Sequence, residues 1–146
     1  MKLSVILLSL GLMLLAPQAY SRDTTLMLSI QDALLSADFK AKLDPNIALF
    51  FGNQKHPKVR QSYGTFPTNK KTNAFNKSDV GACRWAMLSG LIALQNRAKK
   101  EGGNAVINIA SYYKKNTVKS NTKFECHAGA FVAGVALIGK VVKIKK

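Results

Sequence analysis

The sequence predicts a single α+β domain in which two helices pack on a mostly antiparallel sheet of four or five strands, held by one disulfide. The main observation is a change of hydrophobic period. Apolar residues recur at every third or fourth position over residues 78–103 and at every second position over residues 104–113, which indicates a helix followed by a strand. A second helical pattern lies at 29–43. Shorter apolar runs of strand length lie at 47–51, 59–66, 124–131 and 135–144.

Residues 1–21 have the layout of a secretory signal peptide. Lys2 precedes an apolar run at 5–15, and a small-x-small pattern that ends at Ser21 is typical of a cleavage site. The run is shorter than the roughly 20 residues that a membrane-spanning helix needs, and no cysteine follows it for lipidation. We therefore predict cleavage after Ser21, export to the periplasm or out of the cell, and one mature domain at 22–146 without a transmembrane segment.

The first helical pattern has a marked start and end. Ser29 can cap the first turn, with Asp32 in the capping-box position. Pro45 disfavours helical geometry at the residue before it, so we expect one helix that ends at Leu43. The strand predicted at 47–51 follows directly.

Residues 54–77 are basic and the least regular part of the chain. We expect one short strand at 59–66, with Gly64 as a kink or bulge, and a loop for the remainder. Aromatic residues alternate there with lysines, a pattern that can stack on and neutralise single-stranded nucleic acid. These residues are Tyr63, Phe66, Phe75, Lys70, Lys71 and Lys77.

The central helix is predicted from Ser78, a capping hydroxyl, to the glycine pair that begins at Gly102. Its apolar stripe consists of Val80, Cys83, Met87, Leu91, Leu94 and Ala98, widened by Leu88 and Ile92. The residues left mainly for solvent are Arg84, Gln95, Asn96, Lys99 and Lys100. In the strand that follows, alternation predicts Ala105, Ile107 and Ile109 on one face.

The C-terminal part is expected to complete the sheet. Residues 114–123 form a polar hairpin loop, after which 124–131 returns as the partner of the strand at 104–113. Small residues at 128–136 predict close approach of the helix to the sheet, and Gly139 interrupts the last strand at 135–144.

Cys83 and Cys126 are the only cysteines, and an even pair in an exported protein indicates a disulfide. Cys83 lies on the apolar stripe of the helix, and Cys126 shares strand parity with Phe124 and Ala128, so both can point into one core. A zinc site is the weaker alternative, because His56 and His127 are the only other good ligands and no CxxC spacing is present.

The mature chain is strongly basic, with 21 lysines and arginines against seven acidic residues. The electrostatic field of such a net positive charge attracts anionic partners, with an affinity that falls as the salt concentration rises. The plainer interpretation is a solvated basic surface with no binding role. The candidate anion-binding residues are Lys70, Lys71, Lys77, Lys114 and Lys115. The partners considered are an envelope protein, an anionic polymer or a lipid surface, with nucleic acid as a less favoured alternative.

Catalytic chemistry has little support in the sequence. Glu125 and His127 fall on one strand face and form a possible polar site, either as an acid–base pair or, as we expect, as a surface ion pair. Cys126 lies on the opposite face, so it is poorly placed as a nucleophile for His127. No phosphate-binding loop, HExxH helix or GxSxG elbow is present, and we predict no catalytic residue, metal or cofactor.

Several stretches resemble a family of small secreted proteins of Gram-negative bacteria that often carry the label excinuclease ATPase subunit. They lie at 22–28, 48–57, 68–86, 97–116 and 124–137. The label implies ATP hydrolysis and recognition of damaged DNA, whereas this chain has neither a Walker motif nor zinc fingers. The helix, the GGNAVINI strand and the small-residue strand are also loosely similar to YbjQ-like domains and to the Rcs-pathway envelope sensor lipoprotein. That resemblance implies a small α/β sandwich, disulfides and protein–protein signalling.

These observations lead us to expect an exported, non-catalytic binding or envelope-associated module that works through basic loops and protein contacts. A basic nucleic-acid-binding protein is the alternative. An enzyme that uses Glu125 and His127 is the third option, and it requires a cleft around the pair.

Overall fold

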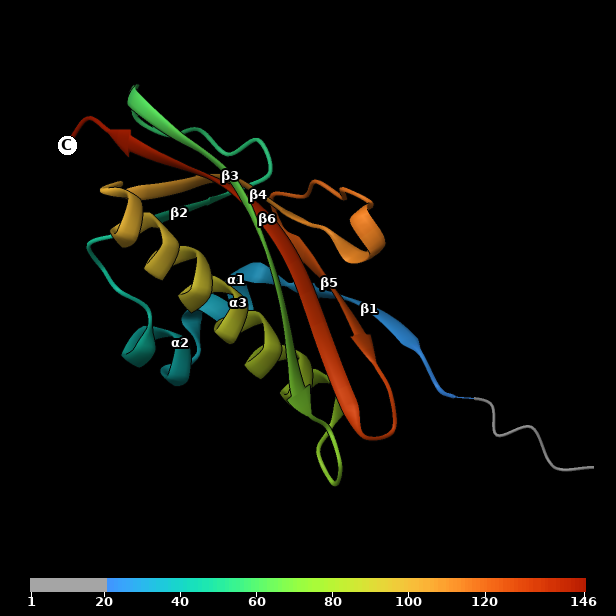
Figure 1. Cartoon of the computed structure of the whole chain (residues 1–146). Coiled ribbons are helices and arrows are strands. Elements are labelled where there is room, and N and C mark those ends of the chain that lie inside the picture. The colour runs from blue at the N-terminus through green and yellow to red at the C-terminus, as the bar shows by residue number, and fades with distance from the viewer. Residues whose placement is uncertain (1–20) are drawn as a thin grey trace, which may run out of the picture.

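The structure, a computed structural model, describes residues 21–146, so the predicted signal peptide lies outside the described residues apart from Ser21. The helices are α1 (Ile30–Leu35), α2 (Ala37–Lys42), α3 (Asp79–Glu101) and a short 3₁₀ turn, η1 (Tyr113–Lys115). The strands are β1 (Thr24–Ser29), β2 (Ala48–Phe51), β3 (Val59–Asn73), β4 (Ala105–Ser111), β5 (Lys123–Ala128) and β6 (Val132–Ile144). Figure 1 shows α3 lying across one face of the sheet.

Strand β6 is the centre of the sheet. One edge of β6 pairs with β3 from Val132 to Ile144, and its other edge pairs first with β5 and then with β4. β1 extends the sheet beyond β5 as an antiparallel strand, whereas β2 lies beyond β4 as a parallel one. The predicted α+β class is confirmed, in the form of a single small domain with a mixed sheet of six strands rather than four or five.

The predicted central helix is confirmed as α3. The Ser78 hydroxyl accepts a hydrogen bond from the Gly81 N–H at 3.0 Å, and Gly102 ends the helix with a φ of 86°. This left-handed backbone conformation strongly favours glycine. Most of the predicted stripe is buried, but Val80 is 40% exposed, because it lies in the first turn at the end of the sheet.

Gln95 was expected to face solvent and is instead 3% exposed. Its amide oxygen accepts from the Asp44 N–H, and its amide nitrogen donates to the carbonyls of Asp44 and Ile47, all at 2.9 Å. The loop between α2 and β2 thus packs over α3, where the Gln95 side chain forms hydrogen bonds to its backbone and Lys99 forms an ion pair with Asp44. The hydrophobic period of the helix alone cannot reveal these contacts.

The single helix predicted at 29–43 is two helices, α1 and α2. The Ser29 hydroxyl caps α1 by accepting from the Asp32 N–H at 3.1 Å, as the capping position predicted. Ser36 then leaves helical geometry, with a ψ of 151°, and its hydroxyl donates to the Ala33 carbonyl at 2.7 Å. A serine that bonds a preceding carbonyl competes with the helix, and the break allows Phe39 of α2 to be buried at 2% exposure.

Strand β3 is longer than predicted, because pairing with β6 continues beyond residue 66 to Asn73. The kink expected at Gly64 is confirmed by a register shift and a φ of 112°. Lys70 and Lys71 therefore lie on a strand and not in a loop.

The alternation expected for β4 fails at Asn108, which adopts a φ of 53° in a register shift against β6. This bulge moves Ile109 into the main core with Val106, while Ile107 stays with Ala105 in a smaller cluster. Gly139 does not interrupt β6, since pairing runs through it. A Cβ at Gly139 would lie 2.6 Å from Cγ1 of Val106, so close packing explains the glycine.

Strand β5 was expected to pair with the strand at 104–113 and pairs instead with β1 and β6. β4 and β5 use successive segments of the same edge of β6, so they are not neighbours along their lengths. The small residues predicted to lie under the helix consequently lie on both faces of the sheet. Ala128 and Ala133 are buried in the core with α3, whereas Gly134 and Ala136 line a groove on the opposite face.

The predicted disulfide is confirmed. Cys83 of α3 and Cys126 of β5 are joined, with Cα atoms 5.8 Å apart and neither residue exposed. The bond ties the helix to the arm of the sheet that β5 and β1 form.

Candidate functional site

A groove of about 750 Å³ lies on the face of the sheet away from α3. Gly134 and Ala136 of β6 contribute to its lining, and because neither carries a side chain larger than a methyl group, the space above the strand is open. The other lining residues are Ser21, Arg22, Asp23, Asn69, Lys71, Tyr113, His127, Gly129, Ala130, Phe131 and Val132.

His127 forms one wall of this groove within a compact polar cluster. Its Nε2 lies 2.6 Å from Oε1 of Glu125, and its Nδ1 lies 3.1 Å from Oδ1 of Asp23. The ring stacks on Tyr113 with centroids 3.4 Å apart, and the Tyr113 hydroxyl donates to Asp23 at 3.3 Å. The Glu125 and His127 side chains are only 14% and 13% exposed, so this pair is more buried than the expected surface ion pair.

This cluster limits the chemistry of the imidazole. A general acid or base needs a ring nitrogen within reach of the substrate. Both nitrogens of His127 face carboxylates, and the stacked ring is held in place. Only the protonated imidazole can donate to both carboxylates at once. Acid–base chemistry at His127 would require Asp23 or Glu125 to move away.

Three of the five candidate anion-binding lysines meet on this face. Lys71 lines the groove, while Lys114 and Lys115 line an adjoining hollow of about 350 Å³ that shares Asn69 and Ala136 with it. The other two lie elsewhere. Lys70 pairs in register with the core residue Val135 and so belongs to the α3 side of β3, and Lys77 lies in the turn before α3.

Arg22 also lines the groove, and its side chain is engaged by protein groups. Its guanidinium makes two contacts with Asp79, at 2.8 and 3.0 Å, and donates to the Gly129 carbonyl at 2.7 Å. The hydrogen bond and charge of Arg22 lower the pKa of Asp79, and the same pair raises the pKa of Arg22. Arg22 is therefore occupied by protein groups, which leaves Lys71 to supply positive charge inside the groove.

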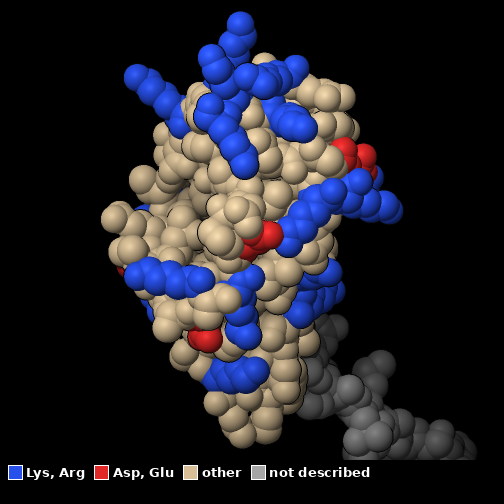
Figure 2. Space-filling view, turned by 90° about the vertical axis from the view of Figure 1, so that its left-hand side faces the viewer, with Lys and Arg blue, Asp and Glu red and all other residues tan. Residues whose placement is uncertain are grey.

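The structure also reveals a basic end of the molecule that includes none of the five candidate anion-binding lysines. The first residues of β3 pair with the last residues of β6, and the Lys145 N–H donates to the Lys58 carbonyl at 3.0 Å. Two basic segments far apart in sequence thus meet, and their exposed members include Lys55, Lys58, Arg60, Lys143, Lys145 and Lys146. Figure 2 shows basic side chains gathered at the top of the molecule, where the C-terminus lies in Figure 1. Only the strand register could have predicted this basic end.

Two of the three aromatic residues considered for stacking on nucleic acid pack against other parts of the protein. Tyr63 and Phe66 pack against the core, and the Arg97 guanidinium lies 3.9 Å from the Phe66 ring centre. Phe75 alone of the three is strongly exposed, at 54%.

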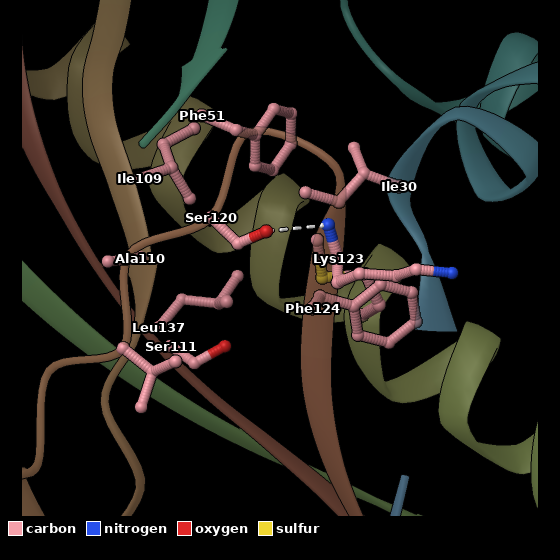
Figure 3. Close-up of a pocket in the computed structure, with 11 residues that line it drawn as sticks. Ile30, Phe51, Ile109, Ala110, Ser111, Ser120, Lys123, Phe124 and Leu137 are labelled. Carbon is pink, nitrogen blue, oxygen red and sulfur yellow. Dashed lines mark hydrogen bonds between the residues drawn. The ribbon is translucent and has the colours of Figure 1, made fainter. Parts of the chain in front are cut away.

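A much smaller cavity lies where core residues meet the loop before β5, and it is too small to be a ligand site. Its volume is about 10 Å³, enough for one water molecule. Ile30, Phe51, Ile109 and Leu137 surround it, and the Ser120 hydroxyl accepts the Lys123 N–H at 2.9 Å beside it (Figure 3).

Within residues 21–146, no three His, Cys, Asp or Glu side chains are grouped so that they could hold a metal ion. No helix of this part of the chain has the length and hydropathy required to cross a membrane. Comparisons with protein-family models, with curated proteins and with solved structures found no match for this chain. The fold and site define a small, disulfide-bonded α+β domain with a groove and an adjoining hollow that three lysines line, and the family resemblance of the sequence stays a prediction.

Proposed function

We propose that the protein is an exported, non-catalytic binding module whose groove takes an elongated anionic ligand, most simply a segment of an acidic polysaccharide. The observation that supports this proposal is the meeting of Lys71, Lys114 and Lys115 on adjoining hollows of one face. Lysines that line a hollow raise the local concentration of anions. The carboxylate of Asp23 also lines the groove, but it contacts His127 and Tyr113.

A non-catalytic role fits the state of His127. The side chain with the best potential for proton transfer faces a carboxylate on each nitrogen and an aromatic ring on one face. Export fits the buried disulfide, because such bonds persist in oxidising compartments, together with the signal-like sequence at 1–21.

Nucleic acid is the second candidate ligand, because the same three lysines would also neutralise phosphates. It is less favoured, since Tyr63 and Phe66, two of the three aromatic residues considered for stacking on bases, pack against the core.

The test is binding of a fluorescent sulfated oligosaccharide to the mature protein, measured by anisotropy at several salt concentrations. Lys71→Glu/Lys114→Glu/Lys115→Glu should weaken binding by at least about tenfold, and the affinity of the wild type should fall steeply with salt. The matched control is Lys58→Glu/Lys143→Glu/Lys145→Glu, which changes net charge equally at the basic end and should weaken binding by less than about threefold.

Equal losses in the two triple variants would mean that overall charge, and not the groove, binds the ligand. Tighter binding of a single-stranded oligonucleotide than of the oligosaccharide, lost with the groove lysines, would favour the second candidate instead.

A further inference from the structure

Two turns at the end of the sheet expose a cluster of apolar side chains, which we call the apolar tip. It consists of Phe75 in the turn between β3 and α3, and Phe131 and Val132 where β5 turns into β6. These side chains are 54%, 66% and 47% exposed. The two phenylalanine rings stack with centroids 5.7 Å apart and planes 16° from parallel. A contiguous exposed apolar cluster of this kind typically marks an interaction surface.

The apolar tip is built into the fold. The Ala74 N–H donates to the Phe131 carbonyl at 2.8 Å, and Asn73 pairs with Val132 as the last step of the β3–β6 ladder. The Asn73 side chain accepts the Phe75 N–H at 2.9 Å, which fixes the turn. Arg22 joins α3 to the neighbouring turn through Asp79 and the Gly129 carbonyl. The rings therefore project from two turns that hydrogen bonds hold together.

Positive charge borders the apolar tip. Lys77 lies two residues after Phe75 in the same turn, and Lys71 lies two residues before Asn73 on the groove side. Asp79, the acidic residue that begins α3, is paired with Arg22. Exposed aromatic and aliphatic side chains bordered by lysines match a membrane surface that carries anionic headgroups over an apolar interior.

We propose that the apolar tip docks the protein on an anionic lipid surface, with Phe75, Phe131 and Val132 inserted at the headgroup level and the flanking lysines at the phosphates. This docking goes beyond the proposed function and does not depend on it. Phe131 and Val132 also line the groove, so a docked molecule would hold the mouth of the groove at the headgroups.

The basic end offers the competing orientation. It lies at the opposite end of the β3–β6 ladder, about 40 Å away for strands of this length. A protein held by charge alone would turn the basic end to the membrane and leave the apolar tip in water. The two orientations place Phe131 in different environments.

The experiment places a reporter at the apolar tip of the mature protein. The chain has one tryptophan, Trp85, so Trp85→Phe/Phe131→Trp carries a single reporter there. With phosphatidylcholine vesicles that contain about one-third phosphatidylglycerol, we expect a blue shift of its emission and quenching by lipids brominated in their acyl chains. Pure phosphatidylcholine vesicles should give a much smaller shift.

Phe75→Ser should weaken vesicle binding in sedimentation by about tenfold or more, while leaving oligosaccharide binding in the groove intact. Leu35→Ser on α1 is the matched control, since it removes an apolar side chain that is 58% exposed outside the apolar tip, and it should bind vesicles normally.

Three results would overturn the proposal. The protein could sediment with vesicles while the reporter stays unshifted. Binding could be abolished by Lys58→Glu/Lys143→Glu/Lys145→Glu and unaffected by Phe75→Ser. The reporter could instead shift without vesicles as a dimer forms, which would assign the apolar tip to self-association.

Discussion

Gln95 stabilises a loop that has few other bonds to the helix. Its side chain satisfies three backbone groups of the segment that links α2 to β2, and all three bonds lie in a buried or partly buried setting. Backbone polar groups left unpaired away from water cost free energy, and the cost exceeds the net gain of an ordinary hydrogen bond. The position of Gln95 on the buried side of α3 is therefore required by the loop and not by the hydrophobic pattern.

We expect Gln95→Ala to lower the free energy of unfolding by about 2 kcal/mol or more, because the buried groups at Asp44 and Ile47 lose their partner. Urea denaturation measures the change. Asn96→Ala, at the next position of α3, which is exposed, is the matched control and should change the free energy of unfolding by less than about 0.5 kcal/mol. Equal effects of the two variants would show that Gln95 does not hold the loop.

At the scale of elements, α3 is joined to the sheet by packing and by one covalent bond. It packs against β6, β3 and β5, and the disulfide attaches it to β5 near the His127 cluster. β5 holds β6 through only two residue pairs, His127 with Gly134 and Ala128 with Ala133. The arm formed by β5 and β1 therefore depends on the disulfide more than β3 does, since β3 pairs along the whole of β6.

Cys83→Ala/Cys126→Ala should lower the free energy of unfolding by about 4 kcal/mol, the value that the chain-entropy model gives for a sequence separation of 43 residues. Hydrogen exchange should speed up most in β1 and β5, because they lie on the arm that the bond anchors. Uniform acceleration across β3 and β6 as well would contradict a local anchoring role.

At the scale of the whole molecule, two ion pairs connect segments that are distant in sequence. Arg22 pairs with Asp79 at 2.8 Å, and Lys99 pairs with Asp44 at 2.6 Å. Contact with Lys99 and the Asn46 N–H lowers the pKa of Asp44, as Arg22 lowers the pKa of Asp79. The first pair holds the start of the described chain, and the second holds the loop before β2.

These depressed pKa values predict a loss of stability in acid. A carboxyl whose pKa is lower in the folded state stabilises the fold fully above its unfolded pKa of about 3.9, and this contribution disappears as pH falls through the folded value. Asp44→Asn/Asp79→Asn should therefore be less stable than the wild type at pH 7 and approach it near pH 2. Urea midpoints across that range measure the difference.

The control for this pH effect is Asp38→Asn, which removes one carboxylate from an exposed position of α2 outside both pairs. If the difference in urea midpoint between the wild type and the double variant stayed constant with pH, the two carboxylates could not be the source of that difference.

The elements whose signals are local could be predicted from the amino-acid sequence. Helix α3 follows from an apolar period with a capping serine and a terminal glycine, and the α+β class follows from the switch of period at Gly102. The disulfide follows from two cysteines that both point inward on their own elements. The positions of Glu125 and His127 on one face follow from strand alternation.

Features that depend on strand register and on contact between distant segments are visible only in the folded structure. The length of β3, the bulge at Asn108 and the burial of Gln95 arise from partners that no local pattern encodes. The meeting of Lys71 with Lys114 and Lys115, the enclosure of His127 by Asp23, and the apolar tip all depend on which edge of β6 each strand occupies. The alternation of residues along a strand predicts which face of the sheet each side chain lies on. Only the hydrogen-bonded register determines which residues of adjacent strands lie next to one another, and a binding surface consists of such adjacent residues.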